Sequence, residues 1–311
     1  MKAVRFSTYG DASVLRYEDT PRPAPAPGQV LVQVAATSFN PIDGAIRAGY
    51  LQQVFPVQLP HTPGIDVAGT IAALGDGIAR FAVGDRVIGF LPMTEDGAAA
   101  DYVLAPAEAL AYAPTSLPLA DAAAIPAVAL TAWQALFEHA HLQAGQRVLI
   151  NGAGGGVGGF AVQLAADAGA SVIATASPRS SSAVAAHGAT QIVDYTATSL
   201  PAAVTEPVDV VVNLVPASAP EMAALVGLIR PGGVLVTTGA PAEPDLARDV
   251  RVVRMGLHGE TAQLAQIVSR IDGGQLTVDI SASYPLSETA TVHVRAAAGE
   301  LRGKVLLIPG S

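Results

Sequence analysis

The chain has 311 residues, of which 50% are apolar and 14% are charged, with a formal net charge of −9. This length predicts two domains with a sizeable buried core. The acidic balance argues against nucleic acid as a partner, because no basic stripe exists to neutralise phosphates. The apolar runs are too short to span a membrane, and the absence of cysteine excludes disulfides, thiol catalysis and cysteine-ligated metal sites.

Residues 1 to about 115 have the pattern of short strands separated by turns. Val30–Val34 and Val83–Ile88 are clear strand signals. The Pro-rich stretch Pro21–Gly28 lies between two strand signals, so we interpret it as an ordered extended connection rather than a flexible linker. The N-terminus also opens as a strand, at Val4–Phe6, and has no signal-peptide core, so the cytoplasm is the expected location.

From about residue 119 the pattern changes to strands alternating with Ala-rich helices. Helices are predicted at Leu119–Ala140, Gly158–Ala168, Ser181–His187 and Thr261–Ile271, and strands at Arg147–Asn151, Ser171–Ala176, Gln191–Val193, Asp209–Val212, Gly233–Thr237 and Arg251–Met255. This alternation requires parallel strands with right-handed crossovers, hence an α/β fold with a doubly wound Rossmann sheet. Beyond it the short-strand pattern returns and runs to Ile308. The sequence therefore predicts a Rossmann domain at 119–274, inserted into a β-rich substrate domain made of 1–118 and 275–311.

A glycine-rich segment carries the strongest chemical signal. The predicted strand Arg147–Asn151 runs into Gly152-Ala153-Gly154-Gly155-Gly156-Val157-Gly158, and a helix is predicted to begin at once. Glycines allow a tight turn and close approach to a pyrophosphate, while the helix N-terminus supplies free N–H groups and partial positive charge. Because the strand, the helix and further strand–helix units are all in place, this pattern predicts nucleotide binding.

The end of the second predicted strand indicates which nucleotide binds. NAD sites usually place an acid there, about 20 residues on, to hold the ribose diol. This chain has Ser177-Pro178-Arg179 instead. Ser177 can donate a hydrogen bond and Arg179 can pair with a 2′-phosphate, so the sequence favours NADPH. The alternative is that Arg179 is an ordinary solvated loop residue.

These segments, with several others, resemble one family. The chain is similar to the medium-chain dehydrogenase/reductase superfamily, specifically its zinc-free quinone oxidoreductase (zeta-crystallin-like) branch, in which the substrate domain is GroES-like. The resemblance runs through Asn40–Asp43, Pro63–Gly69, Phe81–Val87, Leu130–Trp133, the glycine turn with Gln163, Ala189–Tyr195 and Gly303–Leu307. Zinc-dependent relatives carry a histidine after the Pro-Gly pair, where this chain has Ile65, so no metal is expected. His61 is interpreted as structural rather than catalytic.

The resemblance also implies roles for single residues. Asn40 and Thr131 are expected beside the nicotinamide, where they would orient an amide or a substrate carbonyl. Gly154, Gly155, Gly156, Val157 and Gly158 would hold the pyrophosphate, Tyr195 would lie near the 2′-phosphate, Leu214 would contact the cofactor, and Gly239 and Ala240 would lie beneath the nicotinamide ribose. The Thr131 hydroxyl could instead bond its own helix backbone.

Two further residues keep alternatives open. Tyr50 is expected in a loop that flanks the substrate, where it could donate a proton, although it could equally be a packing residue. Asp43 could be a pocket-wall residue, but a carboxylate at a helix N-terminus is favoured. The last predicted strand, Arg251–Met255, would be a sheet edge that pairs with a second subunit, so the resemblance implies a homodimer.

Without a metal to polarise the substrate, hydride transfer from the cofactor suits a substrate carbon that is already electron-poor. The first hypothesis is therefore an NADPH-dependent reductase of a quinone or of an activated C=C bond in an enone or alkenal. A biosynthetic enoyl reductase acting on a polyketide-like intermediate and a non-catalytic NADPH-binding protein are the alternatives. The length and shape of the loop from Tyr50 to Pro60 would separate the first two, because that loop controls the size of the substrate pocket.

Overall fold

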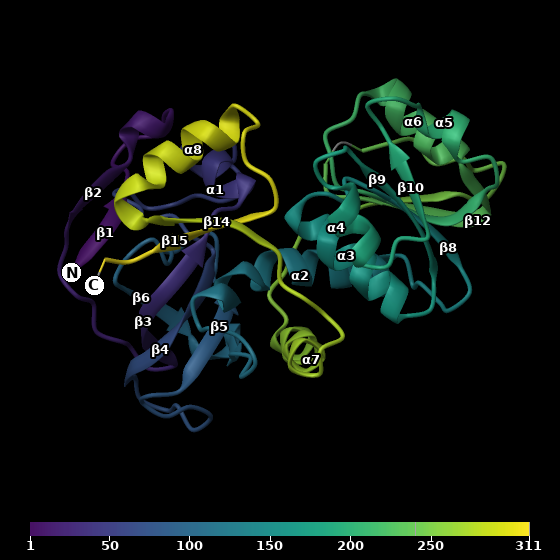
Figure 1. Ribbon diagram of the computed structural model, residues 1–311. Coiled ribbons are helices and arrows are strands. Elements are labelled where there is room, and N and C mark those ends of the chain that lie inside the picture. The colour runs from purple at the N-terminus through teal and green to yellow at the C-terminus, as the bar shows by residue number, and fades with distance from the viewer. Residues whose placement is uncertain (240, 311) are drawn as a thin grey trace. The chain divides into compact units, whose positions relative to one another are not determined.

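The computed structural model describes residues 1–239 and 241–310, which form two compact units (Figure 1). The first unit contains residues 1–127 and those from 259 onward, and the second contains Val128–His258. The sequence predicts boundaries at 118/119 and 274/275, whereas residues 119–127 and 259–274 belong to the first unit here. Helix α7 (Thr261–Asp272) is held there because the Asp272 carboxylate accepts the backbone N–H groups of Thr115 and Ser116, each at 2.9 Å.

The second unit is built on a six-stranded sheet with the order β10-β9-β8-β11-β12-β13, and every pair in it is parallel. Its strands are β8 (Arg147–Asn151), β9 (Ser171–Ala176), β10 (Gln191–Asp194), β11 (Val208–Asn213), β12 (Ile229–Thr237) and β13 (Arg251–Arg254). The strand order reverses between β8 and β11, which is the topological switch point of a doubly wound sheet. The predicted fold class is confirmed.

Helices lie on both faces of this sheet. In Figure 1, α3 (Gly156–Asp167) and α4 (Ser181–Ala186) lie on one side, and α5 (Leu200–Ala203) and α6 (Ala219–Gly227) lie on the other. The predicted long helix Leu119–Ala140 is divided into three pieces: a 3₁₀ turn at Asp121–Ala124, α2 (Pro126–Trp133) and a π-helix at Gln134–His139. Pro126 explains the first division, because proline lacks an N–H and is accommodated only in the first turn of a helix.

The first unit is mostly antiparallel. Its main sheet has the order β14-β15-β3-β4-β5-β7, with β6 also pairing with β3, and a separate two-stranded sheet joins β1 to β2. These strands are β1 (Lys2–Arg5), β2 (Arg16–Asp19), β3 (Gln29–Ser38), β4 (Asp66–Leu74), β5 (Arg86–Phe90), β6 (Tyr102–Pro106), β7 (Leu110–Tyr112), β14 (Ile280–Pro285) and β15 (Lys304–Ile308). Because β15 pairs with β3, the C-terminal segment is part of the sheet built by the N-terminal third.

Two helices besides α7 belong to this unit: α1 (Pro41–Arg47) and α8 (Thr289–Ala297). Short 3₁₀ turns lie at Ala12–Val14, Ala107–Ala109 and Leu286–Glu288. The prediction of short strands alone after residue 274 is wrong at α8. The β-branched residues there favour a strand, but Thr289, Val292 and His293 share one buried helical face, so packing overrides propensity. Among the described residues, no helix is long and apolar enough to cross a bilayer.

Candidate active site

The glycine-rich turn joins β8 to α3 and brings their backbones into close contact. A Cβ atom added to Gly158 would lie 2.2 Å from the carbonyl oxygen of Gly152. Gly152 itself has φ of +96°, in the left-handed region that favours glycine. The N–H groups in the first turn of α3 have no acceptor within the helix and form the positive end of its dipole. The turn therefore has the backbone geometry on which a pyrophosphate binds.

Side chains from three neighbouring strands hydrogen-bond along the carboxyl edge of the sheet, beside this turn. Thr175 Oγ1, on β9, accepts from the Gly152 N–H at 2.8 Å and donates to Asn151 Oδ1 at 3.0 Å. Asn151 Nδ2 in turn donates to Asn213 Oδ1, on β11, at 2.8 Å. The sequence reasoning missed these residues. A polar residue at or beside the carboxyl end of each of these strands was the signal that could have found them.

The predicted nucleotide-binding residues outside the turn lie just beyond the carboxyl ends of four strands: Ser177 and Arg179 after β9, Tyr195 after β10, Leu214 after β11 and Gly239 after β12. Ala240 lies outside the described residues. The Leu214 N–H donates to the carbonyl of Asn151, and the Gly239 N–H donates to Thr237 Oγ1 at 3.1 Å. The carboxyl ends of parallel strands meet at one edge, so these residues share the edge that carries the glycine turn.

No acidic residue directly follows β9, where a ribose-binding carboxylate would lie. Arg179 is exposed there, and Tyr195 is 58% exposed. The nearest carboxylate in the strand register is Asp194, opposite Ala176. Its Oδ1 accepts from the backbone N–H and the hydroxyl of Thr196, at 2.9 and 2.6 Å, so that oxygen is used within its own loop.

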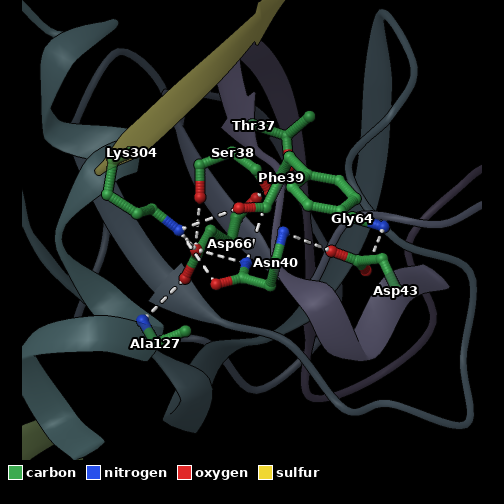
Figure 2. A network of polar contacts seen from close by, with 9 residues as sticks. All are labelled: Thr37, Ser38, Phe39, Asn40, Asp43, Gly64, Asp66, Ala127 and Lys304. Atoms are coloured by element: carbon green, nitrogen blue, oxygen red, sulfur yellow. Dashed lines mark hydrogen bonds and ion pairs between the residues drawn. The ribbon is translucent and has the colours of Figure 1, made fainter. Parts of the chain in front are cut away.

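The first unit holds a buried polar cluster around Asp66, shown in Figure 2. Asp66 and Lys304 are 0% and 3% exposed, and their carboxylate and ammonium groups lie 3.1 Å apart. Asp66 Oδ2 also accepts from Ser38 Oγ and from Asn40 Nδ2, the latter at 2.8 Å. Lys304 Nζ donates to Asn40 Oδ1 at 2.9 Å, and Asp66 Oδ1 accepts the Ala127 N–H at 2.7 Å. We call Ser38, Asn40, Asp66, Ala127 and Lys304 the Asp66 network.

The sheet explains how residues so distant in sequence meet. Ser38 ends β3, Asp66 begins β4 and Lys304 begins β15, and β3 pairs with both of the other strands. Ala127 lies in the first turn of α2, so Asp66 also accepts a hydrogen bond from a helix N-terminus. The sequence predicts no role for Asp66 or Lys304, which lie within two of the segments that resemble the family, Pro63–Gly69 and Gly303–Leu307.

Asp43 lies in the first turn of α1, as its favoured interpretation predicts. Its Oδ2 accepts the backbone N–H of Asn40 at 3.0 Å and its Oδ1 accepts that of Gly64 at 3.1 Å. Burial raises the pKa of this carboxyl to about 7, although the two N–H donors oppose the rise. Asp43 therefore joins the start of α1 to the loop before β4, on the far side of Asn40 from Asp66.

His61 is buried and supports packing. Its ring contacts that of Phe6 edge-on at 5.3 Å, and burial lowers its pKa despite Asp96, whose Oδ1 lies 3.5 Å away. His61, Asp43 and Ile65 line one shallow hollow. Within residues 1–239 and 241–310, no group of three or more histidine, aspartate or glutamate side chains could hold a metal ion.

The three residues expected to serve catalysis lie in different surroundings. Asn40 is 6% exposed in the Asp66 network, and Tyr50 follows α1 with 84% of its surface exposed. Thr131 belongs to the second unit, is 8% exposed and lies one turn beyond Ala127 on α2. Their catalytic roles stay predictions.

Comparison with known proteins identifies the family. The model of the alcohol dehydrogenase GroES-like domain matches residues 26–115, and that of a zinc-binding dehydrogenase matches residues 187–307. The chain is 31% identical to a chloroplastic quinone-oxidoreductase homolog of Spinacia oleracea, over 99% of this chain and 98% of the relative. It belongs to the quinone oxidoreductase branch of the medium-chain dehydrogenase/reductase superfamily.

Solved structures agree with this assignment. The structure of a quinone oxidoreductase from Coxiella burnetii has a TM-score of 0.88 and 30% identity, with 99% of both chains covered. A mycobacterial protein solved in complex with NADPH has a TM-score of 0.86 and 29% identity, with 99% of this chain and 100% of that chain covered. The predicted family is confirmed. Membership of this family makes the chain an oxidoreductase that acts on a small molecule.

Proposed function

We propose that this oxidoreductase uses NADPH to reduce a quinone or an activated C=C bond. The observation that carries the cofactor proposal is the end of β9, where Ser177 and Arg179 stand in place of a carboxylate, beside a glycine turn of the required geometry. A carboxylate there would repel a 2′-phosphate, whereas a guanidinium attracts one. The relative solved with NADPH and the relatives named quinone oxidoreductase support the proposal.

The residues present fit such a dinucleotide. The close packing of Gly158 on Gly152 lets the first turn of α3 approach the pyrophosphate, and Leu214 and Gly239 line the same sheet edge. Arg179 and Tyr195 are exposed next to it and would hold the adenosine 2′-phosphate. A bound nicotinamide would supply the hydride. Asn40 and Thr131 would orient the nicotinamide end, and Tyr50 stays a candidate proton donor.

The substrate class follows from the groups available. The chain has no cysteine to ligate a metal, and the zinc-dependent histidine position holds Ile65. Hydride acceptance by a quinone or an enone requires little acid assistance, because the developing negative charge is delocalised onto oxygen. The protein's contribution is then positioning and exclusion of water.

Turnover tests the proposal. We expect purified protein to oxidise NADPH in the presence of one or more of a panel of quinones, alkenals and cyclic enones, and to oxidise NADH much more slowly. Equal rates with both cofactors would contradict the assignment of NADPH. Failure to bind either cofactor, measured by titration of cofactor fluorescence, would contradict the proposed function as a whole.

Arg179→Ala isolates the 2′-phosphate contact. A hydrogen bond to a charged group contributes about 1.5–3 kcal/mol, so we expect the dissociation constant of NADPH to rise about 10- to 100-fold and that of NADH to stay unchanged. Arg80→Ala, at an exposed arginine of the first unit, is the matched control. Equal affinity of Arg179→Ala and wild type for NADPH would show that Arg179 is an ordinary solvated side chain.

A homodimer is also proposed, through the outer edge of the Rossmann sheet. Strand β13 is the terminal strand there, and its two central valines are only half-buried. An unpaired edge strand with apolar side chains is covered in most stable proteins. Light scattering after gel filtration should give twice the 31.4 kDa chain mass. The Met255 N–H donates to Thr237 on β12, so the N–H of Val252, three residues earlier, faces the outer edge, and Val252→Pro should shift the mass toward the monomer.

A further inference from the structure

Three polar side chains form a continuous row of hydrogen bonds across the carboxyl edge of the sheet in the second unit. Thr175, Asn151 and Asn213 lie on the neighbouring strands β9, β8 and β11, and Asn151 is paired with Asn213 in the strand register. The row begins at the Gly152 N–H, which donates to Thr175, and ends at the Val215 carbonyl, which accepts from Asn213 Nδ2 at 2.9 Å. We call Thr175, Asn151 and Asn213 the edge relay.

The backbone at its two ends determines the direction of every hydrogen bond in the edge relay. An N–H can only donate and a carbonyl can only accept. Thr175 therefore accepts from Gly152 and donates its hydroxyl proton to Asn151 Oδ1 at 3.0 Å, which leaves Asn151 Nδ2 to donate to Asn213 Oδ1 at 2.8 Å. Turning Asn151 over would force Asn213 to turn as well. The oxygen of Asn213 would then face the Val215 carbonyl, and two acceptors would lie together.

The two ends of the edge relay also contact each other directly. A Cβ atom added to Gly152 would lie 2.7 Å from Val215 Cγ1, so the glycine turn packs against the loop that follows β11. The Leu214 N–H donates to the Asn151 carbonyl at 2.9 Å and joins the same two segments a second time. Thr175 and Asn213 are 2% and 0% exposed, so water cannot replace a lost partner at low cost. The turn and the loop are therefore held together as one element.

This element lies at the switch point of the sheet. The strand order reverses between β8 and β11, and a dinucleotide bound to a doubly wound sheet crosses the edge at that point. The glycine turn follows β8 and the loop follows β11, so a ligand that spans the switch point contacts both segments. A group bound at the end of β9, where Arg179 lies, is separated from the loop by the width of two strand spacings, roughly 10 Å.

We infer that Thr175, Asn151 and Asn213 are positioning residues, which hold the glycine turn and the loop after β11 at one separation for a ligand that spans the switch point. The edge relay acts on the pyrophosphate and on what lies beyond it, and not on the adenosine 2′-phosphate. This inference rests on the proposed function, because it takes the glycine turn to bind the pyrophosphate of NADPH.

Thr175→Val tests the first link, because it removes the hydroxyl and keeps nearly the same side-chain shape. We expect the dissociation constant of NADPH to rise about tenfold, the effect of one hydrogen bond of roughly 1.4 kcal/mol. Adenosine 2′-monophosphate has neither a pyrophosphate nor a nicotinamide, so its dissociation constant should stay unchanged. Thr175→Ser keeps the hydroxyl and should bind NADPH as wild type does.

Asn213→Leu breaks the other end and allows a test of coupling. Thr175 and Asn213 lie on strands separated by β8, and in the described residues no hydrogen bond joins them directly. Substitutions at independent sites this far apart have additive free energies, so two tenfold effects would combine to about 100-fold. If both residues act through Asn151, the variant with Thr175→Val and Asn213→Leu should bind NADPH no more weakly than Asn213→Leu alone.

Thr190→Val is the matched control for the loss of a threonine hydroxyl. Thr190 lies at the opposite edge of the same sheet, where its Oγ1 donates to the Val172 carbonyl at 2.9 Å. This substitution removes one hydrogen bond from the second unit and leaves the edge relay intact. The affinities for NADPH and for adenosine 2′-monophosphate should therefore both match those of wild type.

The possible outcomes are distinct. Equal losses of affinity for NADPH and for adenosine 2′-monophosphate in Thr175→Val would overturn the inference, since they would show a general disturbance of the second unit. Wild-type affinity for NADPH in Thr175→Val would overturn it as well, and so would additive effects in the double variant. In each of these cases NADPH binding by the wild type leaves the proposed function standing, whereas its absence contradicts the proposed function itself.

Discussion

The two candidate binding regions of this molecule are built in opposite ways. The glycine turn of the second unit is a single stretch of backbone, from Gly152 to Gly158, and offers N–H groups and space. The Asp66 network of the first unit is made of side chains from β3, β4, β15 and the N-cap of α1, with one N–H from α2, and includes two buried charges (Figure 2).

This difference determines what each region tolerates. The turn depends on the absence of side chains at Gly152, Gly154 and Gly158, where an added Cβ would lie 2.7, 2.5 and 2.2 Å from its nearest neighbour. The network depends on every member being present, because a buried charge that loses its partner becomes strongly destabilising. The turn can therefore be recognised from a short sequence, whereas the network exists only once three strands have paired.

The largest effect is expected at Gly158, where the backbone of the turn leaves no room for a side chain. In Gly158→Ala the new Cβ would meet the Gly152 carbonyl oxygen at 2.2 Å, and because that oxygen is backbone, β8 and α3 must separate. We expect a loss of about 1–3 kcal/mol in the free energy of unfolding, as in other overpacked sites, and loss of measurable NADPH binding. Urea denaturation and cofactor titration measure the two effects.

Gly227→Ala is the matched control, since it adds the same methyl group within a helix of the same unit. No heavy atom lies within 4 Å of a Cβ added to Gly227, which ends α6. Alanine is a better helix former than glycine, so stability should stay the same or rise slightly. If both variants behaved alike, the turn would not be the closely packed element described here.

The sequence predicts most of the second unit because its signals are local. Alternating strands and helices, and the glycines between β8 and α3, lie within short windows, and the structure confirms the parallel sheet there. Thr175 and Asn213 were missed although they lie at the edge of that sheet, because their contacts depend on strand order. Asp66 and Lys304 are 238 residues apart, so no local pattern pairs them.

Helix α8 was missed for a related reason, and it brings His293 against a second buried cation of the first unit, Arg47 on α1. Its His293 Nδ1 lies 3.2 Å from Nη1 of Arg47, on α1, and the histidine ring packs edge-on against Phe39 at 4.8 Å. Burial, and to a smaller extent the Arg47 charge, lowers the pKa of His293 to about 3. His293 is therefore the neutral acceptor for a buried guanidinium.

The smallest predicted effect follows from this pKa. Below its ordinary pKa of 6.5, His293 gains a proton in the unfolded chain but not in the folded one, so stability falls as the pH drops from about 6.5 toward 3. Between pH 7 and pH 5.5 this loss amounts to about 1 kcal/mol. His293→Gln keeps an acceptor for Arg47 and does not titrate, so its free energy of unfolding should fall by that much less over the same interval.

Urea denaturation at the two pH values measures this difference, and His141→Gln, at an exposed histidine, should keep the wild-type dependence. Asp43 acts in the opposite direction, because its raised pKa of about 7 removes stability as the pH rises, but it is unchanged in all three proteins and cancels in the comparison. If His293→Gln and wild type lost stability in parallel, His293 would not be held neutral by the folded chain. The buried interior of the first unit would then tolerate a protonated His293 beside the positive charge of Arg47. The Asp66 network, in which each buried charge has an oppositely charged partner, argues against such tolerance.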